Sequence, residues 1–213
     1  MKLNKVFTAL VFAATTALSG AAQAIPSLSF IIDGDTFNNP YRITNNSSAG
    51  ESVTRFILNL GTIGAGGPFC FDTVYLGPCN ASNQLATPFA PNSGTNLLTG
   101  MVAPVIVGDG ANILDISFTN FTVGKTFIWD IDVDSTSAVS VFGNNLIGAT
   151  AFVDFSDGQR LIGSLVGVAG NPDASQFTVT GIVQTPVPEP ATLALMGLGL
   201  AGLGWARRKR AAK

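Results

Sequence analysis

The central part of the chain, residues 25–187, consists of short apolar or alternating runs separated by Gly, Asn, Asp and Pro, a pattern typical of β-strands joined by turns. No stretch of it keeps the 3.6-residue apolar period of an amphipathic helix. Short strands in one domain-sized segment predict a single all-β domain, a β-sandwich or jelly-roll-like fold. We expect its strands at 28–32, 52–60, 101–107, 112–118, 126–134, 146–155, 159–168 and 175–184.

Turn and loop signals divide these runs. Asp157-Gly158 lies between two apolar runs, and Asp-Gly favours the tight turn of a β-hairpin. We therefore expect a hairpin around 155–160. Segments rich in Asn, Ser and Gly at 45–50 and 92–100 are expected to be surface loops.

The composition excludes several classes of site. The chain has no His and 2 Cys, so it has neither a Ser-His-Asp triad nor a four-thiolate zinc site. Residues 25–187 hold four basic side chains against twelve acidic ones, a net charge of −8. An acidic domain repels polyanions, and we expect no nucleic-acid partner.

The first 24 residues have the pattern of a secretory signal peptide. Lys2 and Lys5 form a positive start, 6–18 are apolar, and Ala22-Gln23-Ala24 fits a cleavage site. We therefore expect 1–24 to be a signal helix that is removed, and residues 25–187 to be an exported domain.

The last residues, 188–213, have a second pattern in three parts. Pro188-Glu189-Pro190 precedes an uncharged apolar run at 191–206. The 16 residues of that run would span about 24 Å as a helix, short of the ~30 Å hydrocarbon core but within the mismatch that bilayers tolerate. A transmembrane helix is expected here. The basic residues that follow would hold its end in the cytoplasm; they are Arg207, Arg208, Lys209 and Arg210.

This three-part tail resembles the PEP-CTERM sorting signal of Gram-negative bacteria that make exopolysaccharide. The resemblance implies a partner, the exosortase, an integral membrane enzyme that cuts near the Pro-Glu-Pro sequence. It also implies a route: the inner membrane in transit, then the cell envelope or the extracellular matrix. A weaker resemblance at 112–167 to uncharacterised β-rich exported domains supports a β-sandwich and implies no activity.

Cys70 and Cys79 are the two cysteines of the chain. Export places them in an oxidising compartment, where an even number of cysteines favours a disulfide. We expect a Cys70–Cys79 disulfide with a structural role.

The segment 126–134 contains the clearest candidate site. In one continuous strand, Phe127, Trp129, Ile131 and Val133 would face the core, and the other face would carry Asp130, Asp132 and Asp134. Carboxylates about 6.6 Å apart along a strand can converge on calcium, the one cofactor considered. The spacing does not continue as an EF-hand, because Ser135 and Val141 replace the required Gly and Glu. The alternative is a solvated acidic face that prevents edge-to-edge aggregation.

Together these features predict an exported, non-enzymatic protein of the cell envelope or extracellular matrix. One alternative is a calcium-dependent module that binds exopolysaccharide. Another is a secreted hydrolase that uses a pair of carboxylates, although no nucleophile motif supports it.

Overall fold

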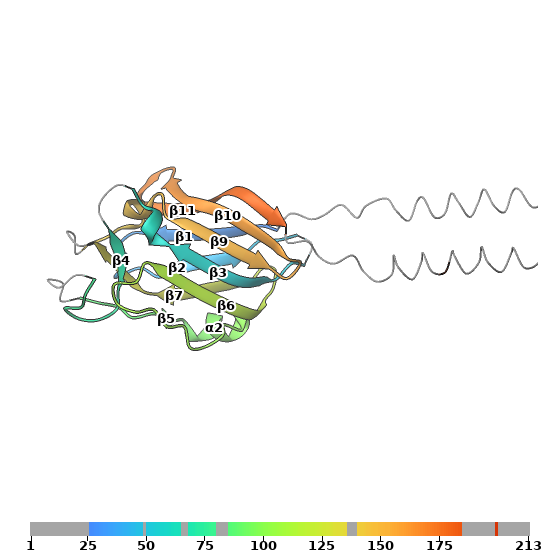
Figure 1. The fold of residues 1–213 in the computed structure, drawn as a ribbon, viewed down its shortest axis with the longest axis horizontal. Coiled ribbons are helices and arrows are strands. Elements are labelled where there is room, and N and C mark those ends of the chain that lie inside the picture. The colour runs from blue at the N-terminus through green and yellow to red at the C-terminus, as the bar shows by residue number, and fades with distance from the viewer. Residues whose placement is uncertain are drawn as a thin grey trace, which may run out of the picture. The chain divides into compact units, whose positions relative to one another are not determined.

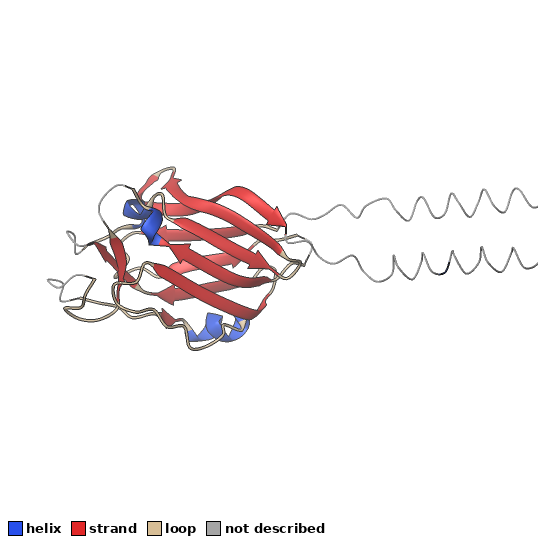
Figure 2. Ribbon diagram, viewed as in Figure 1, coloured by secondary structure: helices blue, strands red, loops and turns tan. Residues whose placement is uncertain are grey.

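The structure is a computed structural model that describes residues 26–48, 50–64, 68–79, 85–135, 140–184 and Gly199. Strands make up most of its regular structure (Figures 1 and 2). Its elements, in chain order, are β1 (Leu28–Asp33), β2 (Tyr41–Asn45), β3 (Val53–Asn59), η1 (Leu60–Thr62), β4 (Phe69–Asp72), β5 (Ala90–Pro91), α2 (Ser93–Thr99), β6 (Ile113–Phe121), β7 (Thr126–Asp130), β8 (Asp132–Ser135), η2 (Gly143–Leu146), β9 (Thr150–Phe155), β10 (Gln159–Val168) and β11 (Asn171–Gln184).

The described strands form two sheets. Nine belong to a curled antiparallel sheet in the order β5-β7-β2-β1-β11-β10-β9-β3-β6. The other two, β4 and β8, pair with each other. The predicted all-β class is confirmed, and the curl lets two halves of the large sheet face one another across a shared core, as in a sandwich.

Aromatic packing shows how far the sheet curls. Phe118 on β6 and Phe127 on β7 come from strands near opposite edges of the sheet, yet their ring centroids are 5.1 Å apart. Trp129 is fully buried and stacks on Tyr41 at 5.4 Å and on Phe30 at 5.8 Å. The prediction that Trp129 faces the core is confirmed.

Helix α2 bridges the two edges of the curled sheet, so the expectation of a loop at 92–100 is wrong. Thr95 Oγ1 accepts a hydrogen bond from Ile128 N on β7 at 3.1 Å, and Thr119 N on β6 donates to Gly100 O at 2.9 Å. Asn92 caps the helix start through Gly94 N, and Gly100 ends it at φ 62°. At seven residues the helix is too short to show a helical period.

Several strand boundaries also differ from expectation. The run at 101–107 pairs only through Met101, in an isolated bridge to Phe118. Strands β2, β4 and β5 were not predicted. The expected strand at 146–155 starts only at Thr150, as β9, because Leu146 ends the short helix η2. The expected strand at 126–134 is interrupted at Ile131. Partner strands, which a local pattern does not specify, decide these limits.

The predicted hairpin at 155–160 is confirmed. Gly158 has φ 83° and its N–H donates to Phe155 O at 3.1 Å. Arg160 on β10 then pairs with Asp154 on β9. The positive φ explains why glycine follows the aspartate here.

No helix in the described ranges has both the length and the apolar character needed to cross a membrane. The predicted signal peptide at 1–24 and the predicted transmembrane helix at 191–206 lie outside those ranges, apart from Gly199. Both remain predictions.

Candidate functional site

The acidic segment around residue 131 passes from one sheet to the other. Asp130 ends β7 in the nine-stranded sheet and is exposed, whereas Asp132 begins β8 in the two-stranded sheet and is 2% exposed. Asp134, two residues further on, is 0% exposed. The expectation that Asp130, Asp132 and Asp134 share one strand face is therefore wrong: the break at Ile131 separates Asp130 from the other two.

A third carboxylate that the sequence analysis missed joins Asp132 and Asp134. In the register of β4 and β8, Asp72 lies opposite Asp132 and Cys70 lies opposite Asp134. Residues that lie opposite each other in an antiparallel pair project to the same side. Strands β4 and β8 form a two-stranded ribbon. The three carboxylates and the Cys70 side chain therefore share one face of this β4–β8 ribbon, and Phe71 and Val133 occupy the other.

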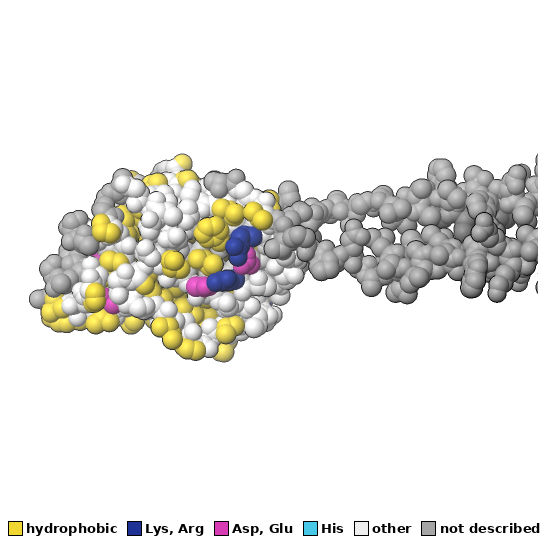
Figure 3. All heavy atoms as spheres, viewed as in Figure 1, with side chains coloured by type: hydrophobic (Ala, Val, Ile, Leu, Met, Phe, Trp, Pro, Cys, Tyr) yellow, Lys and Arg dark blue, Asp and Glu magenta, His cyan; other side chains and the backbone are white. Residues whose placement is uncertain are grey.

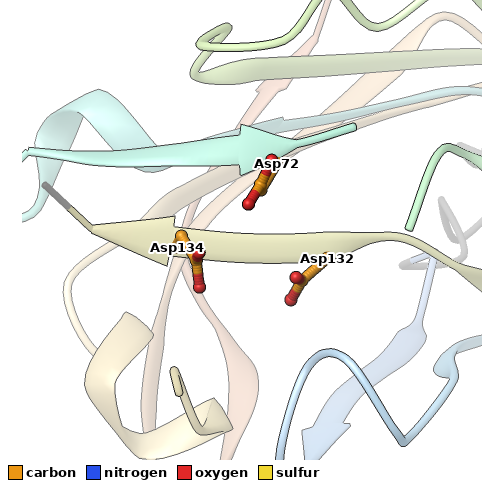
Figure 4. A group of neighbouring side chains, drawn as sticks. All are labelled: Asp72, Asp132 and Asp134. Carbon is orange, nitrogen blue, oxygen red and sulfur yellow. The ribbon is translucent and has the colours of Figure 1, made fainter. Parts of the chain in front are cut away.

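The three carboxylates lie close together and away from solvent. One carboxylate oxygen from each of Asp72, Asp132 and Asp134 lies within 4.8 Å of the others. The exposed fractions are 1% for Asp72, 2% for Asp132 and 0% for Asp134. Figure 4 shows the three side chains leaving β4 and β8 on the same side.

Asp132 has a hydrogen-bond partner on only one of its two oxygens. The Thr36 hydroxyl, in the turn after β1, donates to Asp132 Oδ1 at 3.1 Å. The same Thr36 oxygen accepts from Val133 N at 3.3 Å, which fixes the turn against β8. Asp132 Oδ2 is buried and receives no hydrogen bond from any part of the chain that the structure describes.

Burial and mutual repulsion shift the titration of this cluster. Desolvation, and then the charge of Asp134, raise the pKa of Asp132 to about 7. Desolvation, followed by interactions with Asp134 and Asp109, raises the pKa of Asp72 to about 7. Burial, with a further effect from the charge of Asp132, also raises the pKa of Tyr41. Without a cation, the cluster therefore favours bound protons near neutral pH.

The predicted disulfide forms between Cys70 and Cys79, whose Cα atoms are 5.7 Å apart. Asp109 anchors the loop that it closes: its carboxylate accepts hydrogen bonds from Thr73 N at 2.7 Å and Cys79 N at 2.8 Å, and a third from Val74 N. Burial alone would raise the pKa of Asp109, but these amides together hold it below the usual value. Asp109 thus has a structural role beside Asp72.

The second candidate site is the predicted sorting tail, which lies outside the described residues. A family model for the PEP-CTERM protein-sorting motif matches residues 186–209. The chain carries a PEP-CTERM sorting motif. The match includes Pro188, Glu189 and Pro190, and the basic residues as far as Lys209. Comparison with curated proteins and with solved structures gave no match.

This PEP-CTERM motif marks an exported protein that is targeted to an exosortase and passes through the membrane before processing. The match covers the tail and not the β-domain. The chemistry of the β-domain, residues 25–187, therefore follows from its own geometry. Its described part brings together three buried carboxylates, an arrangement that favours protons or a hard cation.

Proposed function

We propose that this protein is a non-enzymatic component of the cell envelope or extracellular matrix, delivered there by exosortase processing of its tail. The observation that carries the proposal is the PEP-CTERM motif at 186–209. The disulfide-closed β-domain suits an oxidising location outside the cytoplasm.

The charged pairs on the surface of the domain support a structural role. Arg55 Nε donates to Asp115 Oδ1 at 2.8 Å across β3 and β6. Arg160 donates from a terminal nitrogen to Asp154 Oδ2 at 2.8 Å across β10 and β9. On the face drawn in Figure 3, the basic side chains lie directly beside acidic ones. The carboxylates of Asp115 and Asp154 thus form cross-strand ion pairs, which stabilise the pairing of neighbouring strands.

Burial of the acidic cluster weighs against the two alternatives. A calcium ion that bridges protein and sugar needs an open side, yet Asp72, Asp132 and Asp134 are each at most 2% exposed. A glycosidase needs two carboxyl groups that reach a bound sugar. A surface hollow of about 330 Å³ has no carboxylate among the described residues that line it, which are Leu60, Gly61, Ile63, Gly64, Pro68, Phe69 and Asn112.

The proposed sorting mechanism follows from the residues of the tail. The apolar run at 191–206 would hold the chain in the inner membrane, and the basic run that follows would keep its end in the cytoplasm. Pro188 and Pro190 favour an extended junction, because proline restricts both itself and the preceding residue. An extended junction is accessible to a processing enzyme.

The test compares secretion of the full chain in an exosortase-containing host with that in the same host lacking the exosortase. We expect Glu189→Ala, and deletion of residues 207–210, to leave the protein in the membrane fraction. Asp130→Asn, an exposed carboxylate outside the motif, is the matched control and should be released like the wild type. Release of both tail variants at the wild-type level would refute the proposed processing.

A further inference from the structure

We propose that Asp72, Asp132 and Asp134 bind one calcium ion in a buried structural site between the β4–β8 ribbon and the turn that follows β1. Asp130, the exposed residue at the end of β7, takes no part. The proposal concerns the β-domain and does not depend on where the exported protein finally resides.

The spacing of the oxygen atoms fits calcium. Two oxygen ligands of one ion cannot lie farther apart than twice the ion–oxygen distance. For calcium this largest oxygen–oxygen separation is about 4.6–5.2 Å. One carboxylate oxygen from each of Asp72, Asp132 and Asp134 lies within 4.8 Å of the other two. Magnesium, with its shorter bonds, allows a separation of only about 4.2 Å. The spacing of these oxygens therefore suits the longer bonds of calcium better than those of magnesium.

Burial of the three carboxylates supplies the independent reason for a ligand. A buried ionised carboxylate without compensation is costly, and buried charges are normally paired or bound to a metal. Asp132 is 2% exposed, and its Oδ2 atom accepts no hydrogen bond from the described residues. That atom belongs to a side chain projecting from the same face as Asp72 and Asp134 (Figure 4). A cation beside it would satisfy the oxygen and screen the repulsion among the three groups.

The donor set selects the class of ion. Every side chain of the cluster offers carboxylate oxygen, which suits hard cations such as calcium. The chain has no His, and its two Cys are joined in the disulfide. The site thus lacks the nitrogen and thiolate ligands that favour zinc or copper. The Thr36 hydroxyl, 3.1 Å from Asp132 Oδ1, lies close enough to help orient that carboxylate.

Calcium at this place would stabilise the contact between β4 and β8. The cluster takes one carboxylate from β4 and two from β8, and Cys70 on β4 lies opposite Asp134. Thr36 connects the same cluster to the turn after β1. Binding would therefore resist separation of the ribbon from the large sheet. Extracellular calcium modules work with dissociation constants of about 10⁻⁴–10⁻³ M, so the site would fill after export.

The experiment uses the full exported chain with its disulfide intact, stripped with a chelator and titrated with calcium chloride in a calorimeter. We expect one saturable site per chain, and a Tm rise of roughly 5–10 °C at calcium about 100-fold above Kd. Asp132→Asn and Asp72→Asn should each weaken binding by about tenfold or more, since affinity follows the charge of the ligands. Asp130→Asn is the matched control and should bind like the wild type.

Each other outcome overturns the proposal. If the wild-type protein binds no calcium at millimolar concentration, the three carboxylates share protons and do not hold a metal ion. Tighter binding of magnesium than of calcium would refute the choice of ion. Calcium binding that persists unchanged in both Asp132→Asn and Asp72→Asn, or is lost in Asp130→Asn, would place the site elsewhere. The wild-type titration decides the first two outcomes even if a variant fails to fold.

Discussion

Asp72 on β4 lies directly opposite Asp132 on β8, and both side chains are buried. The two residues are far apart in the sequence, and each has a pKa raised to about 7, chiefly by desolvation. Their proximity gives the domain a stability that should depend on pH and on cations.

Without a divalent cation, the chain should become less stable as pH rises from about 4 to 7. The pKa values of Asp72 and Asp132 are about 7 in the folded state and about 3.9 in an unfolded chain. The folded state therefore holds more protons across this window, and the unfolding free energy falls with rising pH. The stabilisation from these bound protons is complete at pH values below the unfolded-state pKa. It is lost as the pH rises through the folded-state pKa. We expect a loss on the order of a few kcal/mol between about pH 4 and pH 8.

Denaturant titrations in chelator at several pH values measure this effect. Asp132→Asn should make the unfolding free energy depend less on pH. The variant should also be more stable than the wild type at pH 8, because it removes a buried charge. Asp130→Asn should keep the wild-type profile. The pKa values of Asp109 and Asp115 are lowered. These two groups therefore destabilise the folded state as pH falls, and they do so below this pH window. Equal or greater wild-type stability at pH 8 would contradict the prediction. The titratable side chains that interact electrostatically with Asp72 or Asp132 are Asp134, Asp109, Asp35 and Tyr41.

Gly163→Ala should destabilise the domain by roughly 1–3 kcal/mol, the usual cost of overpacking. A methyl group at Gly163 on β10 would overlap Thr178 O and the ring of Phe177 on β11. Gly167→Ala on the same strand is the matched control, because its nearest neighbour would be Ile147 Cδ1 at 3.6 Å, an ordinary contact. Chemical denaturation of both variants tests the prediction, and equal stabilities would show that β11 can move away from β10.

Replacing Cys70 and Cys79 together by Ala should lower the unfolding free energy by roughly 2–3 kcal/mol, since their disulfide closes a short loop. It should also weaken calcium binding, because Cys70 lies opposite Asp134. Urea denaturation and calcium titration of the oxidised wild type and the double variant measure both effects. A reduced wild type should match the variant. Unchanged stability would mean that the Asp109 contacts alone hold the loop.

Much of the fold could be predicted from local patterns. The alternation of apolar and polar residues predicted β1, β3 and β6, and Asp157-Gly158 predicted the β9–β10 turn. Helix α2 was missed because seven residues are too few to show a helical period. Strand β2 was missed although its buried and more exposed residues alternate over its five positions. The run at 101–107 has strand-like composition, but its described pairing is a single bridge at Met101.

Two of the three carboxylates in the buried cluster were named from the sequence. Asp132 and Asp134 share a face because they lie two apart on β8, which periodicity alone indicates. The expectation that Asp130 shares this face was wrong, since the chain leaves the large sheet at Ile131 and joins another. Asp72 was missed although Cys70 and Asp72 alternate with Phe69 and Phe71. That short alternation was the available signal.

Sequence patterns were sufficient for the features that depend on neighbours along the chain: the all-β class, the hairpin turn, the disulfide between the two cysteines and the PEP-CTERM motif at 186–209. The meeting of Asp72 with Asp132 required the folded chain. The face that a strand residue occupies, and the residue opposite it, depend on which strand pairs with it and in what register. Those choices are made by long-range packing, which is why three carboxylates from two distant segments form one buried cluster.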